Sequence, residues 1–252
     1  MERRFRCTGC GKCCQGRLPL SVPDALAHAD RFPLFVLWAP VRPGGRSYDL
    51  TRQLGVTLDL KKKKQAALRV AILSYVPSGM KCPALQDDGL CAVHDAKPLR
   101  CRAMPLSGAR AEDDQDDLLL PRAGWECDVG EDAPVVYRDK TVVARGDYEA
   151  EREQLIKDAA ILRPFATMML QAAPQIRMDV EKMASRPMGG HVITDTAHLI
   201  QHLAGVDAFH FAAKQLPVME AFAARTAGVA ELAKEHKRYA DSAAHWRRVL
   251  GG

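Results

Sequence analysis

Cysteine is the residue type with the clearest chemistry in this chain of 252 residues. Four of the eight cysteines fall within eight residues near the N-terminus, in overlapping Cys-x-x-Cys steps. A tight turn with that spacing aims two sulfur atoms at one centre, and the glycines between them permit the positive-φ conformations that such turns use. The eight cysteines are Cys7, Cys10, Cys13, Cys14, Cys82, Cys91, Cys101 and Cys127.

The distribution of these cysteines favours metal binding. No apolar segment like that of a signal peptide follows the charged start of the chain, so we expect a cytoplasmic protein whose thiols stay reduced. Clustered cysteines in a reducing compartment are typical of metal sites rather than disulfides. A single buried cysteine is usually a small hydrophobic residue, but eight confined to residues 1–127 are poorly explained in that way. We therefore predict that all eight are metal ligands.

The adjacent pair Cys13 and Cys14 constrains how the ligands are shared. Neighbouring side chains usually diverge, so we expect one of the pair to complete a site with Cys7 and Cys10. The other would meet the cysteines that come later in the chain. Eight ligands divide into two sets of four, and each set suits a tetrahedral zinc ion or an iron–sulfur cluster. The softness of sulfur does not decide between these metals.

The cysteines and their neighbours form one ordered pattern along residues 5–105. It consists of Phe5-x-Cys7-x-x-Cys10-Gly11-x-Cys13-Cys14-x-Gly16, then Cys82-Pro83-x-Leu85, then Cys91, then Pro98-x-x-Cys101-Arg102-x-x-Pro105. This pattern resembles the YkgJ-type cysteine-cluster family, the zinc- or iron-chelating CxxCxxCC domain. Lys97 and His94 depart from residues common in that family, and Cys127 lies beyond the strongest part of the pattern.

The resemblance implies a metal-chelating domain. A flagellin lysine N-methylase shares a related cysteine domain, and that relative implies an iron–sulfur cluster, of the 4Fe-4S type, and methyl-transfer chemistry. The chain carries no glycine-rich strand–turn–helix signature for S-adenosylmethionine. The cofactor we expect is therefore an iron–sulfur cluster, with zinc as the alternative.

Other motifs are weaker. His94 is a possible substitute ligand, because mixed Cys/His zinc sites exist. His198 and His202 are spaced as half a helical metal site, but a zincin has a glutamate where this chain has Leu199. The acidic run at residues 112–117 lacks the spacing and the glycine of an EF-hand, which predicts a solvated loop.

Charge does not favour a nucleic-acid partner. The net charge is +5, and the excess lies in residues 1–127, which hold 20 basic and 14 acidic side chains. Ionisation of all eight thiols would make that half negative, so its positive charge complements thiolates. The four lysines at 61–64 are interpreted as a solvated face. No stretch approaches the roughly 18 apolar residues that a membrane helix needs.

Periodicity and turn signals predict an α+β fold. An irregular cysteine-rich module with short β-hairpins over residues 1–130 would precede a helical region over 147–252, packed against it. Asp88-Gly89 and Arg138-Asp139-Lys140 indicate hairpins, and Ser21 is the predicted cap of a helix that ends near Pro33. Later helices are predicted at 175–185, 194–204, 206–224 and 226–249, with Pro217 as one of the breaks.

Three functions are compatible with these residues. The first is a cytoplasmic metal-binding protein that holds one or two iron–sulfur clusters. The second is a structural zinc module that serves as a platform for a protein or peptide partner. The third is an enzyme that modifies a protein or peptide, by analogy with the methylase. The sequence leaves open whether the protein is an enzyme, its catalytic residues and its oligomeric state.

Overall fold

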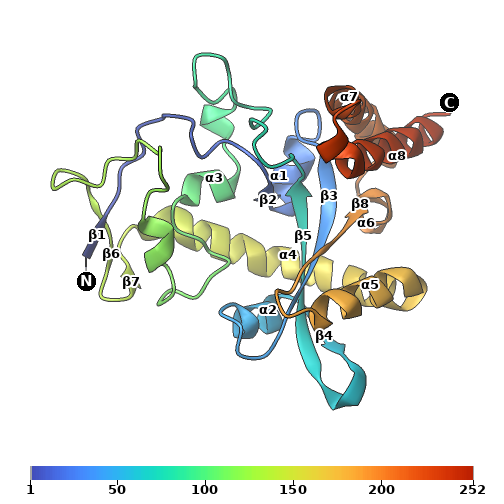
Figure 1. Cartoon of the computed structure of the whole chain (residues 1–252), viewed down its shortest axis with the longest axis horizontal. Coiled ribbons are helices and arrows are strands. Elements are labelled where there is room, and N and C mark those ends of the chain that lie inside the picture. The colour runs from blue at the N-terminus through green and yellow to red at the C-terminus, as the bar shows by residue number, and fades with distance from the viewer. Residues whose placement is uncertain (1, 252) are drawn as a thin grey trace. The chain divides into compact units, whose positions relative to one another are not determined.

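The structure is a computed structural model that describes residues 2–251. Helices and antiparallel sheets both contribute, which confirms the predicted α+β class (Figure 1). The strands are β1 (Glu2–Arg4), β2 (Leu18–Leu20), β3 (Leu34–Val41), β4 (Val56–Asp59), β5 (Gln65–Ser74), β6 (Val135–Arg138), β7 (Thr141–Val142) and β8 (Val192–Asp195). The helices are α1 (Val22–Ala27), α2 (Tyr48–Leu54), α3 (Leu99–Ala103), α4 (Arg145–Ala172), α5 (Pro174–Ser185), α6 (Ala197–His202), α7 (Ala208–Thr226) and α8 (Ala233–Val249).

The chain divides into two compact units, each assembled from separate segments. The first unit contains the segment up to Cys14 together with Trp38–Val70 and Ala84–Val192. The second contains Gln15–Leu37, Ala71–Pro83 and the segment from Ile193 onward. Seven of the predicted ligands therefore belong to the first unit and Cys82 to the second. The division at residues 130–147 that the sequence suggests stays a prediction.

A three-stranded antiparallel sheet, in the order β1-β6-β7, lies in the first unit. Strands β6 and β7 pair Tyr137 with Val142 and are joined by Asp139 and Lys140, which both have positive φ. Such a two-residue turn matches the twist of the flanking strands, and it confirms the predicted hairpin. The addition of β1 was not predicted. It places the N-terminal segment beside β6, with Arg3 opposite Tyr137.

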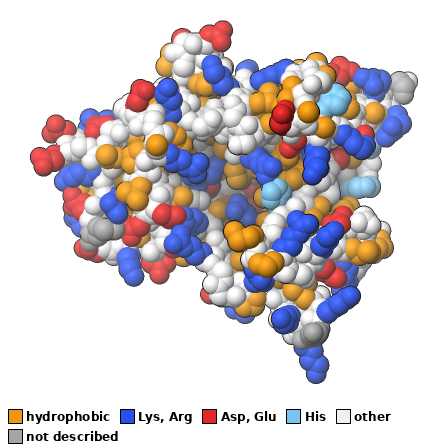
Figure 2. All heavy atoms as spheres, viewed as in Figure 1, with side chains coloured by type: hydrophobic (Ala, Val, Ile, Leu, Met, Phe, Trp, Pro, Cys, Tyr) orange, Lys and Arg blue, Asp and Glu red, His pale blue; other side chains and the backbone are white. Residues whose placement is uncertain are grey.

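Residues of this sheet form a small core with residues from other segments, among them Tyr148 of α4. The core consists of Leu106, Leu119, Val136, Tyr137, Val142 and Tyr148, with Phe5 packed against it. Around β1 and β6, acidic and basic side chains are interspersed on the visible surface (Figure 2). They include the ion pairs of Glu2 with Arg4 and Arg138, both at 2.8 Å.

The second sheet has five strands, in the order β2-β5-β3-β8 with β4 also paired to β5, and α7 and α8 lie side by side (Figure 1). Helix α1 begins as predicted, because the Ser21 hydroxyl accepts a hydrogen bond from the Asp24 backbone N–H at 3.1 Å. It ends earlier than predicted, at Ala27 rather than near Pro33.

Prolines within helices account for one wrong prediction. A helix was predicted over 206–224 with a break at Pro217, yet α7 continues through that proline, as α4 continues through Pro164. A helical proline removes one hydrogen bond and frees the carbonyl four residues earlier. Both prolines are exposed, as are Ala213 and Ala160 four residues before them, so water can satisfy the freed carbonyls. Residues 192–195, partly expected as helix, form β8 instead.

Within residues 2–251, none of the helices combines the length and the apolar character that a membrane span requires.

Candidate metal centre

The first cysteines are held in place by a segment that is distant in sequence. The backbone N–H of Arg6 donates to the carbonyl of Asp128 at 2.8 Å, and the N–H of Asp128 donates back at 3.1 Å. Two residues further on, the Thr8 hydroxyl donates to the carbonyl of Glu126 at 2.9 Å. These bonds bracket Cys127, so the loop that begins with the Cys-x-x-Cys steps runs alongside the last cysteine of the chain.

Two glycines shape the loop between Cys7 and Cys14. Gly9 and Gly11 both have positive φ, as the sequence predicts for turns of this kind. Gly11 is also needed for close packing, because a Cβ atom there would lie 3.0 Å from the Leu85 side chain. The loop therefore rests on the turn that contains Cys91.

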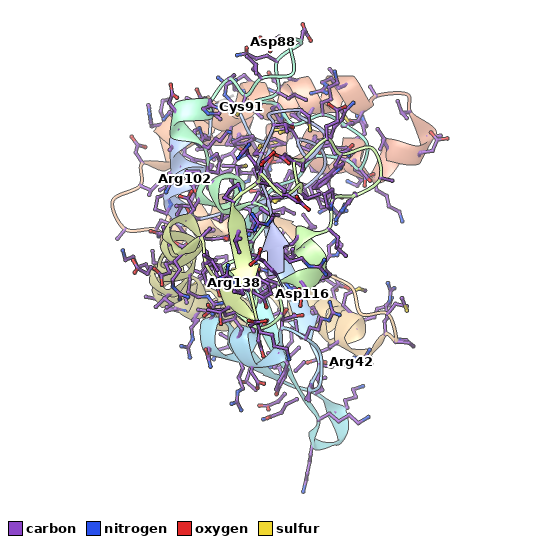
Figure 3. All side chains as sticks on the ribbon, turned by 90° about the vertical axis from the view of Figure 1, so that its left-hand side faces the viewer. Arg42, Asp88, Cys91, Arg102, Asp116 and Arg138 are labelled. Atoms are coloured by element: carbon purple, nitrogen blue, oxygen red, sulfur yellow. The ribbon has the colours of Figure 1, made fainter. Side chains whose placement is uncertain are left out.

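That turn forms where Asp88-Gly89 predicts a hairpin, but it is short. A single bridge joins Leu85 and Cys91, and the Leu90 backbone N–H donates to the Asp88 carboxylate at 2.9 Å. Asp88 stands near the tip of the turn and Cys91 at its base (Figure 3). The predicted approach of Cys82 to Cys91 stays a prediction.

Cys101 lies on α3, a five-residue helix that is fixed to α4 on both sides of the thiol. Arg100 forms a buried ion pair with Glu151, with Nη1 2.8 Å from Oε2, and the Gly108 backbone N–H donates to the same carboxylate oxygen at 2.7 Å. Arg102 pairs with Asp147 at 2.9 Å, and this second pair is solvent-exposed. The position of Cys101 therefore depends on α4.

Two of the clustered thiols are stabilised as thiolates. A hydrogen bond from the Cys14 thiol lowers the pKa of Cys13 to about 6, and the positive charge of Lys97 acts in the same direction. The backbone N–H of Lys12 contributes most to a lowered pKa of Cys10, assisted by the Glu126 backbone. Thiolate is the form in which cysteine binds metal.

Cys127 shows the opposite shift. Burial raises its pKa, and the negative charges of Cys10, Cys13 and Cys7 raise it further. Four thiols thus share one electrostatic neighbourhood, in which ionising each makes ionising the next more costly. A bound cation reverses the sign of that interaction and deprotonates coordinating thiols.

The donor chemistry of this neighbourhood fits a soft metal ion or an iron–sulfur cluster. All eight cysteines are free thiols, and Cys7 and Cys13 are exposed. Within residues 2–251, no three or more Cys, His, Asp or Glu side chains are already gathered closely enough to hold a metal ion. Coordination would therefore require the thiols to turn toward a common point.

The histidines are less suited to this centre than the cysteines. His94 is exposed in a short 3-10 turn, its backbone N–H bonded to the carbonyl of Cys91. His198 and His202 lie on α6 in the second unit.

Sequence reasoning did not identify the groups that position the thiols. Thr8, Glu126 and Glu151 belong to no sequence motif, because their hydrogen-bond partners are 43 to 118 residues away. A buried carboxylate within a helical pattern is the one local signal that could have singled out Glu151.

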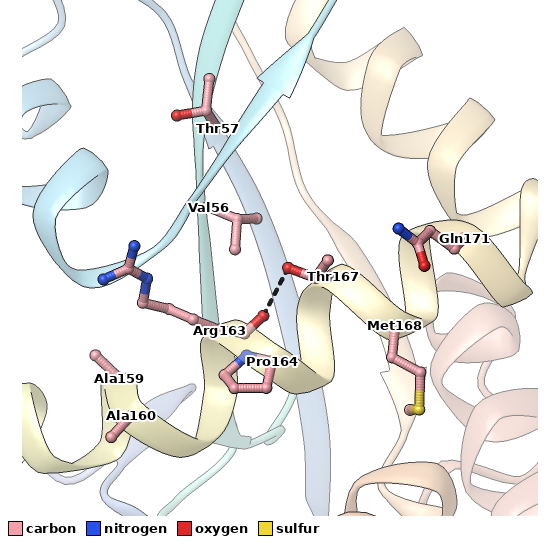
Figure 4. A pocket seen from close by; sticks show the side chains of 9 residues that line it. All are labelled: Val56, Thr57, Ala159, Ala160, Arg163, Pro164, Thr167, Met168 and Gln171. Carbon is pink, nitrogen blue, oxygen red and sulfur yellow. Dashed lines mark hydrogen bonds between the residues drawn. The ribbon is translucent and has the colours of Figure 1, made fainter.

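A groove of about 800 Å³ lies elsewhere in the first unit, between β4 and α4 (Figure 4). The Thr167 hydroxyl donates to the carbonyl of Arg163 at 3.0 Å beside it, in the helical turn that contains Pro164. No cysteine lines this groove, so it is separate from the predicted metal ligands. The groove is lined by Val56, Thr57, Ala159, Ala160, Arg163, Pro164, Thr167, Met168 and Gln171.

Comparison with known proteins supports a metal-chelating domain. A family model described as "CxxCxxCC: Putative zinc- or iron-chelating domain" matches residues 6–123. Seven of the eight cysteines lie within the matched region, and Cys127 lies just beyond its end. No curated protein and no solved structure matches the chain.

The lowered pKa of Cys13 can be measured in the reduced, metal-free protein. Alkylation of Cys13 by iodoacetamide should reach half its maximal rate near pH 6, because thiolate is the reactive form above the pKa. Cys14→Ala removes the donated hydrogen bond, so the midpoint should rise toward the usual pKa of about 8.5. Peptide mass spectrometry follows the labelling, and an unchanged midpoint in the variant would contradict the assigned cause.

The two ion pairs of α3 should differ in their contribution to stability. Glu151→Ala leaves Arg100 buried without its carboxylate and should lower the free energy of unfolding by about 3–5 kcal/mol. Asp147→Ala is the matched control, because it removes an exposed pair worth about 1 kcal/mol or less. Urea unfolding measures both. Equal losses would show that the Arg100 pair does not fix α3.

Proposed function

We propose that the chain, whose residues 6–123 match the model of the CxxCxxCC zinc- or iron-chelating domain, is a cytoplasmic iron–sulfur protein. Cys7, Cys10, Cys13 and Cys127 would hold one cluster, of the [4Fe–4S] type. This set contains the three positions of the overlapping Cys-x-x-Cys steps and the thiol that the 126–128 segment places beside them.

The observation that carries the proposal is the electrostatic coupling of these four thiols. Three of them raise the pKa of Cys127, although two of the three have lowered pKa values themselves. An arrangement that favours thiolates and also makes them repel one another favours a cation at their centre. Without a bound cation, the negative charges of the ionised thiols would have no counter-charge at the centre of the four sulfur atoms.

Basic side chains near the loop are suited to the charge of a loaded centre. Four thiolates around a [4Fe–4S]²⁺ core carry a net charge of −2. Lys97 already acts on Cys13, and Lys12 lies within the loop itself, with its Nζ 3.9 Å from the Glu126 carboxylate. When bound, such a cluster supplies one-electron transfer, and the chain's own groups would tune its potential through charge and hydrogen bonds to sulfur.

A structural zinc ion is the competing occupant, because four thiolates are also a complete tetrahedral zinc set. The family description covers both metals. The two proposals share the same ligands and differ in redox activity and colour.

Metal content after anaerobic purification tests the proposal. We expect the protein to contain iron and acid-labile sulfide. It should also show a broad absorption band at about 400 nm, which arises from iron–sulfur charge transfer. Cys10→Ser and Cys127→Ser should each lower the metal content, because each removes one of four ligands. Met188→Ser alters a side chain that is 97% exposed and serves as the control with unchanged content.

A colourless protein with stoichiometric zinc would replace the cluster by the zinc centre. Full metal retention in both cysteine variants would remove the assigned ligand set.

A further inference from the structure

Strand β4 has a free edge, although it belongs to the five-stranded sheet. Within residues 2–251, β4 pairs only with β5, in an antiparallel register that places Asp59 opposite Gln65. The register continues into the turn between the two strands, where the Leu60 backbone N–H donates to the carbonyl of Lys64 at 2.8 Å. The edge of β4 that faces away from β5 is therefore open to another strand.

The register also identifies the backbone groups that point to this free edge. In an antiparallel pair, residues that bond to the neighbouring strand alternate with residues whose N–H and C=O point away from it. Because Leu60 bonds toward β5, Leu58 does so too. Thr57 and Asp59 therefore direct their N–H and C=O groups to the free edge, and both residues are exposed. An open edge of this kind is a template for a further strand.

The groove between β4 and α4 lies along the same strand (Figure 4). Val56 and Thr57 line it on the strand side, and Ala160 and Pro164 line it on the helix side. Because proline has no N–H, Pro164 frees the carbonyl of Ala160 from its helical hydrogen bond. The groove thus offers apolar surface together with backbone groups that can bond to another chain.

Exposed apolar side chains extend the helix side of the groove. Met168, which lines it, is 40% exposed. Ile156 is 57% exposed and lies one helical turn before Ala160, on the same face of α4. Large apolar side chains exposed beside a groove mark surfaces that bind a partner. A strand laid along β4 would direct every second side chain to this surface.

The charge of the groove indicates which kind of segment fits. Arg163 is the one charged residue in its lining, and its side chain extends from α4 toward β4 (Figure 4). Among the residues that the structure describes, none forms an ion pair with Arg163. The turn that follows β4 adds the exposed side chains of Lys61, Lys63 and Lys64. Acidic side chains are complementary to this surface.

We propose that β4 and this groove bind an extended acidic segment of a partner protein, which adds as a strand to the free edge of β4. Main-chain hydrogen bonds to Thr57 and Asp59 supply affinity, and the wall formed by α4 selects side chains. A carboxylate of the segment pairs with Arg163. Because no cysteine lines the groove, the proposal does not depend on the metal.

Binding of defined peptides to the full chain tests this surface. The probes are short fluorescent peptides with valine at alternate positions and glutamate, glutamine or lysine at the others. Fluorescence anisotropy measures their dissociation constants, and the glutamate peptide should bind most tightly. Methylation of every second backbone nitrogen in that peptide should weaken binding about tenfold for one alternate set. Methylation of the other set should have little effect, because only one set faces β4.

Variants of the chain locate the bound peptide. Arg163→Gln should weaken binding of the glutamate peptide about fivefold, because it removes one charge pair. Lys157→Gln is the matched control, because Lys157 is an exposed residue of α4 outside the groove. Thr57→Pro removes an N–H from the free edge but no bond to β5, so it should weaken binding of all three peptides. If this variant does not fold, the methylated peptides supply the same comparison.

Dissociation constants above about 1 mM for all three peptides would overturn the proposal. Equal weakening by the two sets of methyl groups would show that the peptide does not bind as a strand. Unchanged binding in Arg163→Gln and Thr57→Pro would place the peptide elsewhere. Dimerisation of the wild type that Thr57→Pro abolishes would assign the edge to a second copy of this chain instead.

Discussion

Thiolates that share a small volume repel one another, and this repulsion is the constraint on which the N-terminal loop depends. Folding brings Cys127 beside the loop that contains Cys7, Cys10 and Cys13, where their charges raise its pKa. The same fold lowers the pKa of Cys13 through the Cys14 thiol. A loop that favours negative charge and concentrates it is most stable with a cation bound. Metal binding and folding are therefore expected to be coupled in this part of the chain.

The loop cannot fix this arrangement by itself, because few of its residues are buried in a packed core. Backbone hydrogen bonds of Arg6 with Asp128 supply one anchor. The contact of Gly11 with Leu85 supplies another, because a larger residue at that position would force Leu85 to shift. Helix α3 is held independently, by the buried pair of Arg100 with Glu151. Helix α4 thus positions Cys101 although it contains no ligand.

Local signals in the sequence were sufficient for some features. The cap at Ser21 and the turn at Asp139-Lys140 depend on residues at most three positions apart, and both were predicted. The cysteine pattern pointed to the family whose model matches residues 6–123, because its spacing is specific. The acidic run at residues 112–117 was expected as a solvated loop. Within this run, Asp114 and Asp117 both pair with Arg110, at 2.9 and 2.8 Å, and Asp117 remains exposed.

Features that depend on distant residues were not predictable from one sequence. Strand β1 is short and has no alternating pattern of its own, so its pairing with β6 could not be inferred. The continuation of α7 through Pro217 depends on which face of the helix meets water, which propensity does not encode. The pKa of a thiol depends on its neighbours in space, so spacing alone could not distinguish Cys13 from Cys127.

X-ray absorption at the metal edge of the protein as purified anaerobically examines the convergence of the thiols most directly. If Cys7, Cys10, Cys13 and Cys127 surround a bound metal, its first shell will be sulfur only, at about 2.3 Å. Iron at this edge with a further iron shell would identify a cluster. A first shell of nitrogen and oxygen atoms, or a protein that contains neither iron nor zinc, would contradict the account.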